Sequence, residues 1–358
     1  MHRLLEVRKR VDKTHPGLGN LVALELVAVT AKRCFLCVSP AGCGKSVAAE
    51  AILRLYPRER KHHIIKLTKA GLRKWNDLFS YFDGLVVMDD LGAIDTLYSQ
   101  MTTLTTMAYL VYSHNYRATA VGEDINIRDF FGSCILNVQP IWMPNMVYHS
   151  GWTAMVQDKV LRYYHLIRPK EPAHGAPVLD IDRVPSIQDV TGVELRGKKW
   201  IDLLRIGLIQ WSYARCKEHI PALLRACAAL DDRTEVNSTD YSTLLKLMSN
   251  MRLERYLLDR YEFESALRFK HNEMCILTEL ASFNHLNIAT ICTDFKVSPS
   301  TAHRLLNNVS DWCTVVKGRI VPTDLAMDVL ETIGIRKFKR KKKDGDQDGK
   351  AGVPAEQG

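Results

Sequence analysis

The feature that most constrains the fold is an eight-residue turn, SPAGCGKS, at residues 39–46. It follows an apolar run, Cys34 to Val38, with the composition of a buried strand, and it precedes a helix-like segment, VAAEAILRLY. A glycine-rich turn between a strand and a helix can wrap its backbone N–H groups around a phosphate, because glycine has no Cβ to obstruct the turn. We therefore expect a phosphate-binding loop at the end of a strand.

The residues of this turn have distinct expected tasks. Lys45 can reach the β- and γ-phosphates of a nucleotide, and the Ser46 hydroxyl can ligate Mg²⁺, a hard ion that prefers oxygen ligands. Ser39 stands where the pattern usually has its first glycine. A glycine-rich turn without a ligand is the alternative, but the flanking strand and helix favour nucleotide binding. The contacts are expected from Ser39, Gly42, Cys43, Gly44, Lys45, Ser46 and Val47.

The second motif is a pair of acids at the end of the apolar run LVVM, residues 85–88. A continuous apolar run is typical of a strand buried on both faces. Asp89 is expected to hold Mg²⁺ through water, and Asp90 to orient or deprotonate the attacking water. Aspartate is one methylene shorter than the glutamate more usual at the second position, which favours slow turnover or turnover only on assembly. An acidic strand end that opens a loop is the alternative.

Strand-like and helix-like segments alternate along the first half of the chain. Strands are predicted at 34–38, 62–67, 85–89, 133–139 and 159–167, and helices at 19–33, 69–82 and 96–112. This alternation predicts an α/β fold with a parallel sheet and helices on both of its faces.

These motifs together resemble the additional-strand P-loop ATPases, and within them the AAA+ family. SPAGCGKS resembles the family's Walker A motif and LVVMDD its Walker B motif, over roughly residues 19–168. One strand-like segment, 62–67, separates the two, so the acidic strand is third in chain order. The resemblance implies a P-loop NTPase sheet with a further strand between the Walker A and Walker B strands. It also implies ATP and Mg²⁺ as ligands.

The family also has a polar sensor residue at the tip of that further strand. Asn137 is the first candidate and Gln139 the second, because an amide can both donate to and accept from a water or a phosphate oxygen. The alternative is a strand-end residue that caps a loop.

The resemblance implies two kinds of arginine near the nucleotide. One reaches the γ-phosphate of a neighbouring subunit, and Arg162 is the best-placed candidate, with Lys159 weaker and Arg117 and Arg128 left open. The alternative is that these residues are surface cations. The other kind belongs to a helical lid, where the sequence does not choose between Arg196, Arg205 and Arg215.

The sequence pattern changes near Arg168. Prolines at 169, 172, 177 and 185 indicate a linker or an irregular segment there. The following residues are helical by pattern, and the AAA+ resemblance implies that they form a lid over the nucleotide. The expected organisation is an ATPase domain at 1–168, a linker at 169–197, a helical lid at 198–270, a winged helix-turn-helix at 271–335 and a disordered basic tail at 336–358.

The C-terminal pattern is helix, helix, turn, helix and hairpin, with helices at 273–283, 287–295 and 299–308 and a hairpin turning at 317–319. It resembles a winged helix-turn-helix, in which the third helix enters the major groove of duplex DNA. Docking of a protein is the alternative, because this segment is neutral without its tail. The residues expected at the DNA are Ser298, Ser300, Thr301, His303, Arg304, Lys317 and Arg319.

The net charge of +9 is concentrated near the C-terminus. Residues 296–343 hold eleven Lys or Arg and four Asp or Glu, and the run 336–343 supplies seven of those cations. Such an arm can bind phosphates through counterion release, or it can be a solvated tail or an address signal. No stretch of 18 uninterrupted apolar residues occurs, so we expect a soluble, intracellular, cytoplasmic protein without a membrane span.

Together these features predict an ATP-binding and hydrolysing AAA+-like ATPase with a C-terminal winged helix. The order resembles archaeal-type origin-recognition ATPases and related helicase-loading ATPases, and it implies ATP between the subunits of a homo-oligomer that acts on duplex DNA. One alternative is a nucleotide-switched regulator whose winged helix docks protein. A second is a DNA-translocating motor.

Overall fold

The structure is a computed structural model that describes residues 1–65, 75–94, 96–120, 123–168, 175–195, 200–254, 286–310 and 312–324, with Ile276, Leu280, Ala326 and Met327. Of the predicted helix at 69–82, only its second half lies within these ranges. The predicted tail at 336–358 lies outside them.

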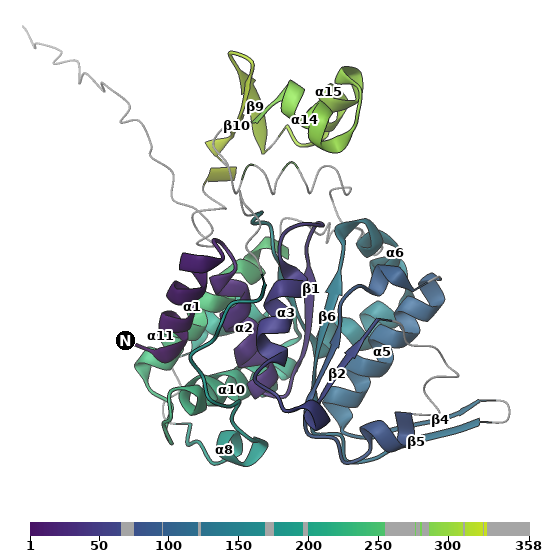
Figure 1. Ribbon diagram of the computed structural model, residues 1–358, viewed down its shortest axis with the longest axis vertical. Helices are drawn as coiled ribbons and strands as arrows, with labels where there is room; N and C mark the ends of the chain where they lie inside the picture. Colours follow the sequence, from purple (N-terminus) through teal and green to yellow (C-terminus); the bar gives the residue numbers. More distant parts are fainter. Residues whose placement is uncertain are drawn as a thin grey trace, which may run out of the picture.

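A five-stranded parallel sheet in the order β2-β3-β6-β1-β7 forms the centre of the fold (Figure 1). Every residue of β1, β3, β6 and β7 is buried, as expected for parallel strands with both faces covered. The prediction that a further strand separates the phosphate loop from the acids is confirmed, because β6 lies between β1 and β3. The strands are β1 (Cys34–Val38), β2 (Lys61–Ile64), β3 (Leu85–Met88), β6 (Ser133–Val138) and β7 (Val160–Tyr164).

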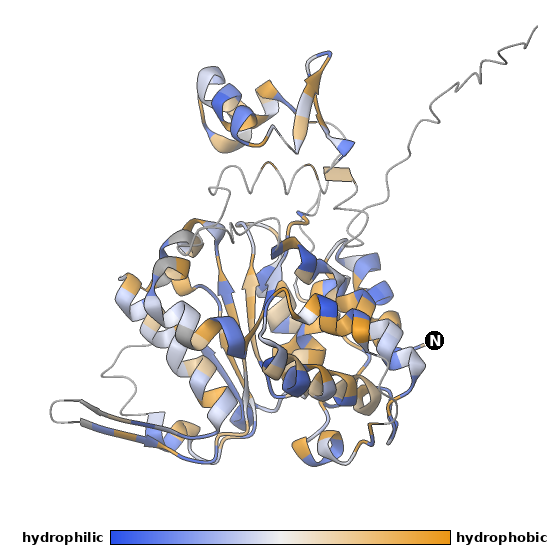
Figure 2. Cartoon of the chain, turned by 180° about the vertical axis from the view of Figure 1, so that it is seen from behind, coloured by the Kyte–Doolittle hydropathy of each residue, from blue (hydrophilic) through white to orange (hydrophobic). Residues whose placement is uncertain are grey.

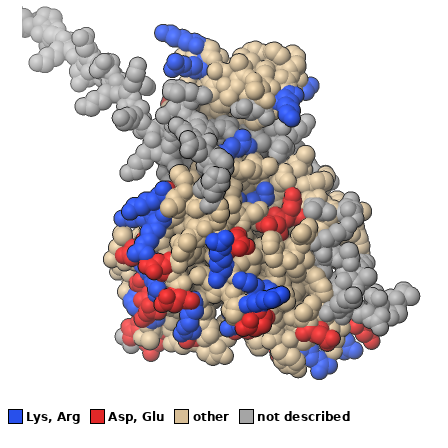
Figure 3. All heavy atoms as spheres, in the orientation of Figure 1, with Lys and Arg blue, Asp and Glu red and all other residues tan. Residues whose placement is uncertain are grey.

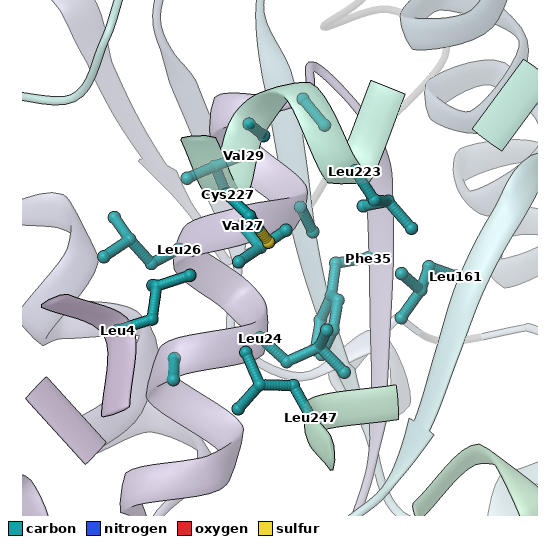
Figure 4. Packing of buried hydrophobic residues seen from close by; sticks show 14 of the residues in the cluster. Leu4, Leu24, Leu26, Val27, Val29, Phe35, Leu161, Leu223, Cys227 and Leu247 are labelled. Atoms are coloured by element: carbon teal, nitrogen blue, oxygen red, sulfur yellow. The ribbon is translucent and has the colours of Figure 1, made fainter. Parts of the chain in front are cut away.

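Helices that precede β1, follow β1 directly or follow β7 cover the first face of this sheet. Phe35 of β1 and Leu161 of β7 pack with Leu24 of α2, Leu223 of α10 and Leu247 of α11 (Figure 4). The helix α2 is apolar on nearly all sides, and this is the pattern of a helix buried in a core. The covering elements are α1 (Arg3–Thr14), α2 (Gly19–Thr30), α3 (Lys45–Leu53), α8 (Ile187–Thr191), α9 (Ile201–Gly207), α10 (Tyr213–Leu230) and α11 (Ser238–Met248).

This packing changes the expectation of a separate linker and lid. Residues 200–254 are helical as predicted, but their apolar side chains belong to the same core as α2 and the sheet. The predicted linker contributes to that core as well, through Leu179, Ile181 and Val190. A lid that hinges as a free body would have to break this core, so we no longer expect α10 and α11 to swing over the loop.

The second face of the sheet is covered by α5 (Leu97–Ser113) and α6 (Met143–Tyr148). Between α5 and β6 the chain forms a hairpin that the sequence did not predict, β4 (Tyr116–Ala120) and β5 (Glu123–Ile127), which projects from the body (Figure 1). The hairpin leads into the first residue of β6, so it lies at the amino-end edge of the sheet, opposite the phosphate loop. Short helical turns connect the larger elements of the body. They are η1 (Arg58–Arg60), η2 (Leu91–Ala93), η3 (Pro140–Trp142), the π-helical turn η4 (Trp152–Val156) and α7 (Gln157–Lys159).

Within its described ranges 286–310 and 312–324, the C-terminal module has two helices and a three-stranded sheet in the order β8-β10-β9. Lys317 and Gly318 both have positive φ, at 49° and 74°, so they form the two-residue turn that hairpins favour. The predicted turn is therefore one residue too long, since Arg319 already pairs with Val316. The predicted helix at 273–283 lies almost entirely outside the described residues. The module's elements are β8 (Leu286–Asn287), α14 (Ile288–Phe295), α15 (Pro299–Asn308), β9 (Cys313–Val316) and β10 (Arg319–Pro322).

Apolar residues gather where the helices meet the sheet, as Figure 2 shows by hydropathy. Among the described residues, no helix combines the length and the apolar character that crossing a bilayer requires.

Candidate functional site

The predicted phosphate-binding loop connects the end of β1 to the start of α3. Gly42 and Gly44 have φ of 77° and 84°, backbone conformations that residues with a side chain rarely adopt. A Cβ on Gly44 would also lie 2.9 Å from the Leu18 side chain. Ser39, at the position of the missing glycine, is buried and has no positive φ; its N–H donates to the carbonyl oxygen of Val138 at 3.1 Å. The serine therefore fits the turn without strain.

Lys45 and Ser46 begin α3, where the first N–H groups of the helix have no partner within it. Lys45 is almost fully buried, whereas the Ser46 side chain is exposed at the loop. The glycine turn, the lysine and the open end of the helix are the kinds of group with which proteins hold an anion.

The acid pair lies at the same edge of the sheet as this loop. β3 is parallel to β6, and its last residue Met88 pairs with Leu136, which pairs in turn with Leu36 of β1. Asp89 follows directly and accepts two hydrogen bonds: from Nδ2 of Asn137 at 3.2 Å and from Nε2 of His63 at 2.9 Å. His63 comes from β2, so three strands converge on one carboxylate.

Asn137 joins the two halves of the site. It lies opposite Cys37 in the β1–β6 ladder, and its amide nitrogen donates to Asp89 beyond the end of β3. The side chain is fully buried, and its Oδ1 has no hydrogen-bond partner among the described residues. A buried amide oxygen without a partner is costly, so this atom is placed to accept from a water or another donor at the site.

Asp90 is held by two hydrogen bonds. Its Oδ2 accepts from Nε2 of Gln139 at 3.0 Å, and its Oδ1 accepts from the backbone N–H of Gly92 at 2.8 Å, capping η2. Each carboxylate oxygen has a second lone pair, so Asp90 can still accept from a water. Both predicted amide residues thus contact the acids: Asn137 contacts Asp89, and Gln139 contacts Asp90.

Behind the acids, α2 contributes a carboxyl group that the sequence analysis missed. Glu25 is fully buried, and neither of its oxygens has a hydrogen-bond partner among the described residues. Burial, and then the nearby charge of Asp89, raise the pKa of Glu25 well above its ordinary value. Burial therefore opposes a second negative charge behind Asp89. Its sequence signal was a single acid inside the apolar run GNLVALELVAVT.

The chain that follows β7 brings two further residues to the loop. His165 is buried, and its Nε2 lies 3.0 Å from the carbonyl oxygen of Cys43, so that nitrogen donates. Burial lowers the pKa of His165 from its ordinary 6.5 to about 4, so the imidazole is neutral at pH 7. Arg168 donates from Nη2 to the carbonyl oxygen of Ala41 at 3.3 Å. Their positions at the carboxyl end of a predicted strand were the available signal.

Arg162 is not a candidate for a neighbouring subunit's phosphate, and this prediction was wrong. Its side chain is 1% exposed and pairs with the carboxylate of Glu254 at 2.8 and 2.9 Å. It also donates to the backbone carbonyl of Gln210 at 2.9 Å. A guanidinium enclosed in this way joins β7 to η5 (Ser249–Leu253) and cannot leave without exposing a buried carboxylate.

The other predicted cations do not meet at the loop either. Lys159 precedes β7, and both it and Arg215 lie over the ring of Tyr112, at the end of α5 remote from the acids. Arg117 and Arg128 belong to the β4–β5 hairpin and its exit, and Arg205 pairs with Asp202 in its own helix. Arg196 lies outside the described residues.

The predicted DNA-binding residues lie together on the C-terminal module. Ser298 caps α15 by accepting from the N–H of Thr301 at 3.3 Å, and its hydroxyl also contacts Ser300 at 3.0 Å. His303, Arg304, Lys317 and Arg319 are exposed. Figure 3 shows cations on this module, whereas cations and acids alternate over the face of the body shown there.

The residues at the sheet edge fit a magnesium ion. Mg²⁺ is usually held by one or two protein oxygens together with waters and substrate phosphates. Ser46 supplies an exposed hydroxyl and Asp89 a partly exposed carboxylate, and the unpartnered oxygen of Asn137 lies between β1 and Asp89. Within the described ranges, no cluster of three or more His, Cys, Asp or Glu side chains forms a metal cage.

Neither a scan against protein-family models nor a search of curated proteins finds a match for this chain. The site is therefore interpreted from its own geometry.

Two buried histidines predict that the protein loses stability in mild acid. Burial, together with the nearby charge of Arg33, lowers the pKa of His219 from 6.5 to about 3, and His165 behaves similarly. Below about pH 6.5 these two histidines are therefore protonated in the unfolded chain. In the folded chain they stay neutral down to about pH 3 to 4. At pH 5 each histidine costs on the order of 2 kcal/mol relative to pH 7.

The free energy of unfolding, measured by denaturant titration at pH 5 and pH 7, tests this. His219→Gln keeps a donor for the Asp158 carbonyl but does not titrate, so it should reduce the difference between the two pH values by roughly half. The exposed His303→Gln should leave that difference unchanged. An undiminished pH dependence in His219→Gln would contradict the prediction.

Proposed function

We propose that this protein is an ATP-binding and hydrolysing P-loop ATPase of the AAA+-like kind. The observation that carries the proposal is the placement of loop 39–46 and of Asp89 and Asp90 at one edge of a parallel sheet, on either side of β6. Nucleotide binding at the carboxyl ends of parallel strands is the general behaviour of open α/β sheets.

The residues divide the work of phosphoryl transfer. The loop amides and Lys45 hold and neutralise the phosphates, and Ser46 and Asp89 hold Mg²⁺, which neutralises charge that develops on the phosphate oxygens. Asp90 accepts a hydrogen bond from the attacking water, sets its direction and takes up its proton as the water attacks. Asn137 fixes Asp89 with its nitrogen and offers its free oxygen to that water or to a neighbouring donor.

We further propose that the C-terminal module is a winged helix that binds duplex DNA. Its support is an exposed α15 whose capped N-terminus carries Ser300 and Arg304, beside a hairpin with Lys317 and Arg319 at its turn. Basic side chains on such a hairpin suit phosphate contacts. The expected work is ATP-controlled assembly on DNA by a homo-oligomer, in replication, maintenance or mobility.

One observation favours the alternative that this module docks protein. Val315 and Val316 on β9 are 45% and 49% exposed, so the hairpin presents two apolar side chains beside its cations. A nucleotide-switched regulator that binds a protein through this hairpin therefore stays the second candidate. The DNA-translocating motor gains no equivalent support. Its one projecting element among the described residues, the β4–β5 hairpin, lies at the sheet edge opposite the nucleotide loop, so it is not placed to move with the nucleotide.

Lys45→Ala should weaken ATP binding at least about 100-fold, because a buried ammonium that contacts the phosphates is lost. Asp90→Asn should keep the ATP affinity within about twofold and lower turnover about 100-fold or more, because asparagine cannot accept a proton in place of the carboxylate. Equilibrium binding and single-turnover hydrolysis separate the two effects.

The matched control for Asp90 is Asp182→Asn, at an exposed acid on the segment between β7 and α8. Tight ATP binding by Lys45→Ala would remove the phosphate-loop interpretation. Unaltered turnover by Asp90→Asn would show that another group positions the water.

Duplex DNA should stimulate ATP turnover, and the triple variant Arg304→Ala, Lys317→Ala, Arg319→Ala should lose this stimulation while keeping the basal rate. Each phosphate contact contributes about 0.9 to the logarithmic salt slope of DNA binding, so three lost contacts should lower that slope by about 3.

The control for this triple variant is Arg54→Ala, Arg58→Ala, Arg183→Ala, which removes equal charge from exposed positions on the body. Absence of any DNA effect in the wild type at low salt would favour the protein-docking alternative.

A further inference from the structure

The edge strand β2 places a histidine against the first acid of the pair. β2 pairs with β3 in parallel, and His63 lies opposite Val87, two residues before Asp89. Side chains alternate between the two faces of a strand, so His63 and Asp89 share one face of the sheet. Nε2 of His63 lies 2.9 Å from Oδ2 of Asp89. The sequence analysis proposed no role for this histidine.

The two histidines of β2 have different surroundings. The His62 ring stacks on Phe82, with ring centroids 4.8 Å apart, so it belongs to the packed side of the strand. The His63 side chain is 46% exposed, beside an Asp89 carboxylate that is 29% exposed. A bond between two partly exposed groups contributes little to folding, because water competes for both partners. We therefore expect this contact to matter more to the site than to the fold.

Asp89 is held by a donor on each of its oxygens. Asn137 donates to Oδ1 at 3.2 Å from β6, and His63 donates to Oδ2 from β2. A carboxylate with a single donor can still turn about its terminal torsion, because that torsion has broad minima. The second donor fixes the plane of the group. Each oxygen keeps another lone pair, so the fixed carboxylate can still accept from the waters of a bound Mg²⁺.

We propose that His63 is a positioning residue that holds Asp89 for the divalent ion of the nucleotide, without binding the ion itself. The inference rests on the proposed nucleotide site. The ring nitrogen that faces the carboxylate, Nε2, is already engaged as a hydrogen-bond donor to it. Donors to a ligating carboxylate orient it toward the metal, and the loss of such a donor typically costs about 10- to 100-fold in metal affinity.

The test measures the affinity of the full-length protein for Mn²⁺, in place of Mg²⁺, with AMP-PCP at saturation. His63→Ala should weaken Mn²⁺ binding about tenfold or more, because Asp89 loses one of its two donors. His63→Gln should stay within about threefold of the wild type, because the glutamine amide can donate in place of Nε2. Without a divalent ion, both variants should bind AMP-PCP as the wild type does, and their melting temperatures should fall by less than about 2 °C.

Two further comparisons separate positioning from other roles. In an Asp89→Ala background, His63→Ala should change Mn²⁺ binding less than about twofold, because the carboxylate that it positions is gone. Electron spin-echo modulation of the bound Mn²⁺ should show the same nitrogen couplings in the wild type and in His63→Gln, since AMP-PCP has no bridging nitrogen. The matched control is His303→Ala, at an exposed histidine of α15, which should leave Mn²⁺ binding unchanged.

Four results would overturn the inference while the wild type still binds Mn²⁺ with the nucleotide. They are unchanged Mn²⁺ binding in His63→Ala, an equal loss in His63→Gln, a matching loss of metal-free AMP-PCP binding, and a nitrogen coupling that His63→Gln abolishes. The last result would make His63 a direct ligand of the ion. A wild type that binds neither AMP-PCP nor Mn²⁺ would overturn the proposed function itself, and this inference with it.

Discussion

The hydrogen bond from Asn137 to Asp89 is the contact on which the site depends. β6 separates the phosphate loop at the end of β1 from the acids at the end of β3, so the two motifs can serve one ligand only if that gap is bridged. Asn137 bridges it: its backbone is fixed opposite Cys37, and its side chain holds Asp89 at 3.2 Å. Parallel register puts all three strand ends at one edge, and the buried amide turns this alignment into a defined position for the carboxylate.

Burial decides which groups near the loop carry charge. It raises the pKa of Glu25 well above its ordinary value, so burial opposes a charge on the carboxyl behind the acids. It lowers the pKa of His165 to about 4, so the imidazole against Cys43 is neutral at pH 7. On the accessible side, Asp89 accepts a hydrogen bond from His63, and Arg168 donates to the carbonyl oxygen of Ala41. This separation suits a ligand that combines phosphates with a divalent ion, because neutral groups support the loop while charged groups face the ligand.

The sequence predicted those parts of the fold that leave local patterns. β1 was predicted with its observed bounds, since a glycine turn ends it, and the continuous apolar runs located β3 and β6 within a residue or two. Arg162 was misassigned because its partner Glu254 lies 92 residues away, and no local pattern reveals such a pair. The β4–β5 hairpin was missed although its strands alternate apolar and polar residues, as in Asp124-Ile125-Asn126-Ile127. His63 became part of the site only when strand order placed β2 beside β3.

The central claim is that the loop and the acid-tipped strand hold one metal ion together with a nucleotide. Electron paramagnetic resonance of Mn²⁺ in place of Mg²⁺, with AMP-PNP present, tests it most directly. The account predicts one tightly held Mn²⁺ per bound nucleotide, with Asp89→Ala weakening that binding about tenfold or more while Asp182→Ala leaves it unchanged. Equally tight Mn²⁺ binding by Asp89→Ala and the wild type, at saturating nucleotide, would contradict the account.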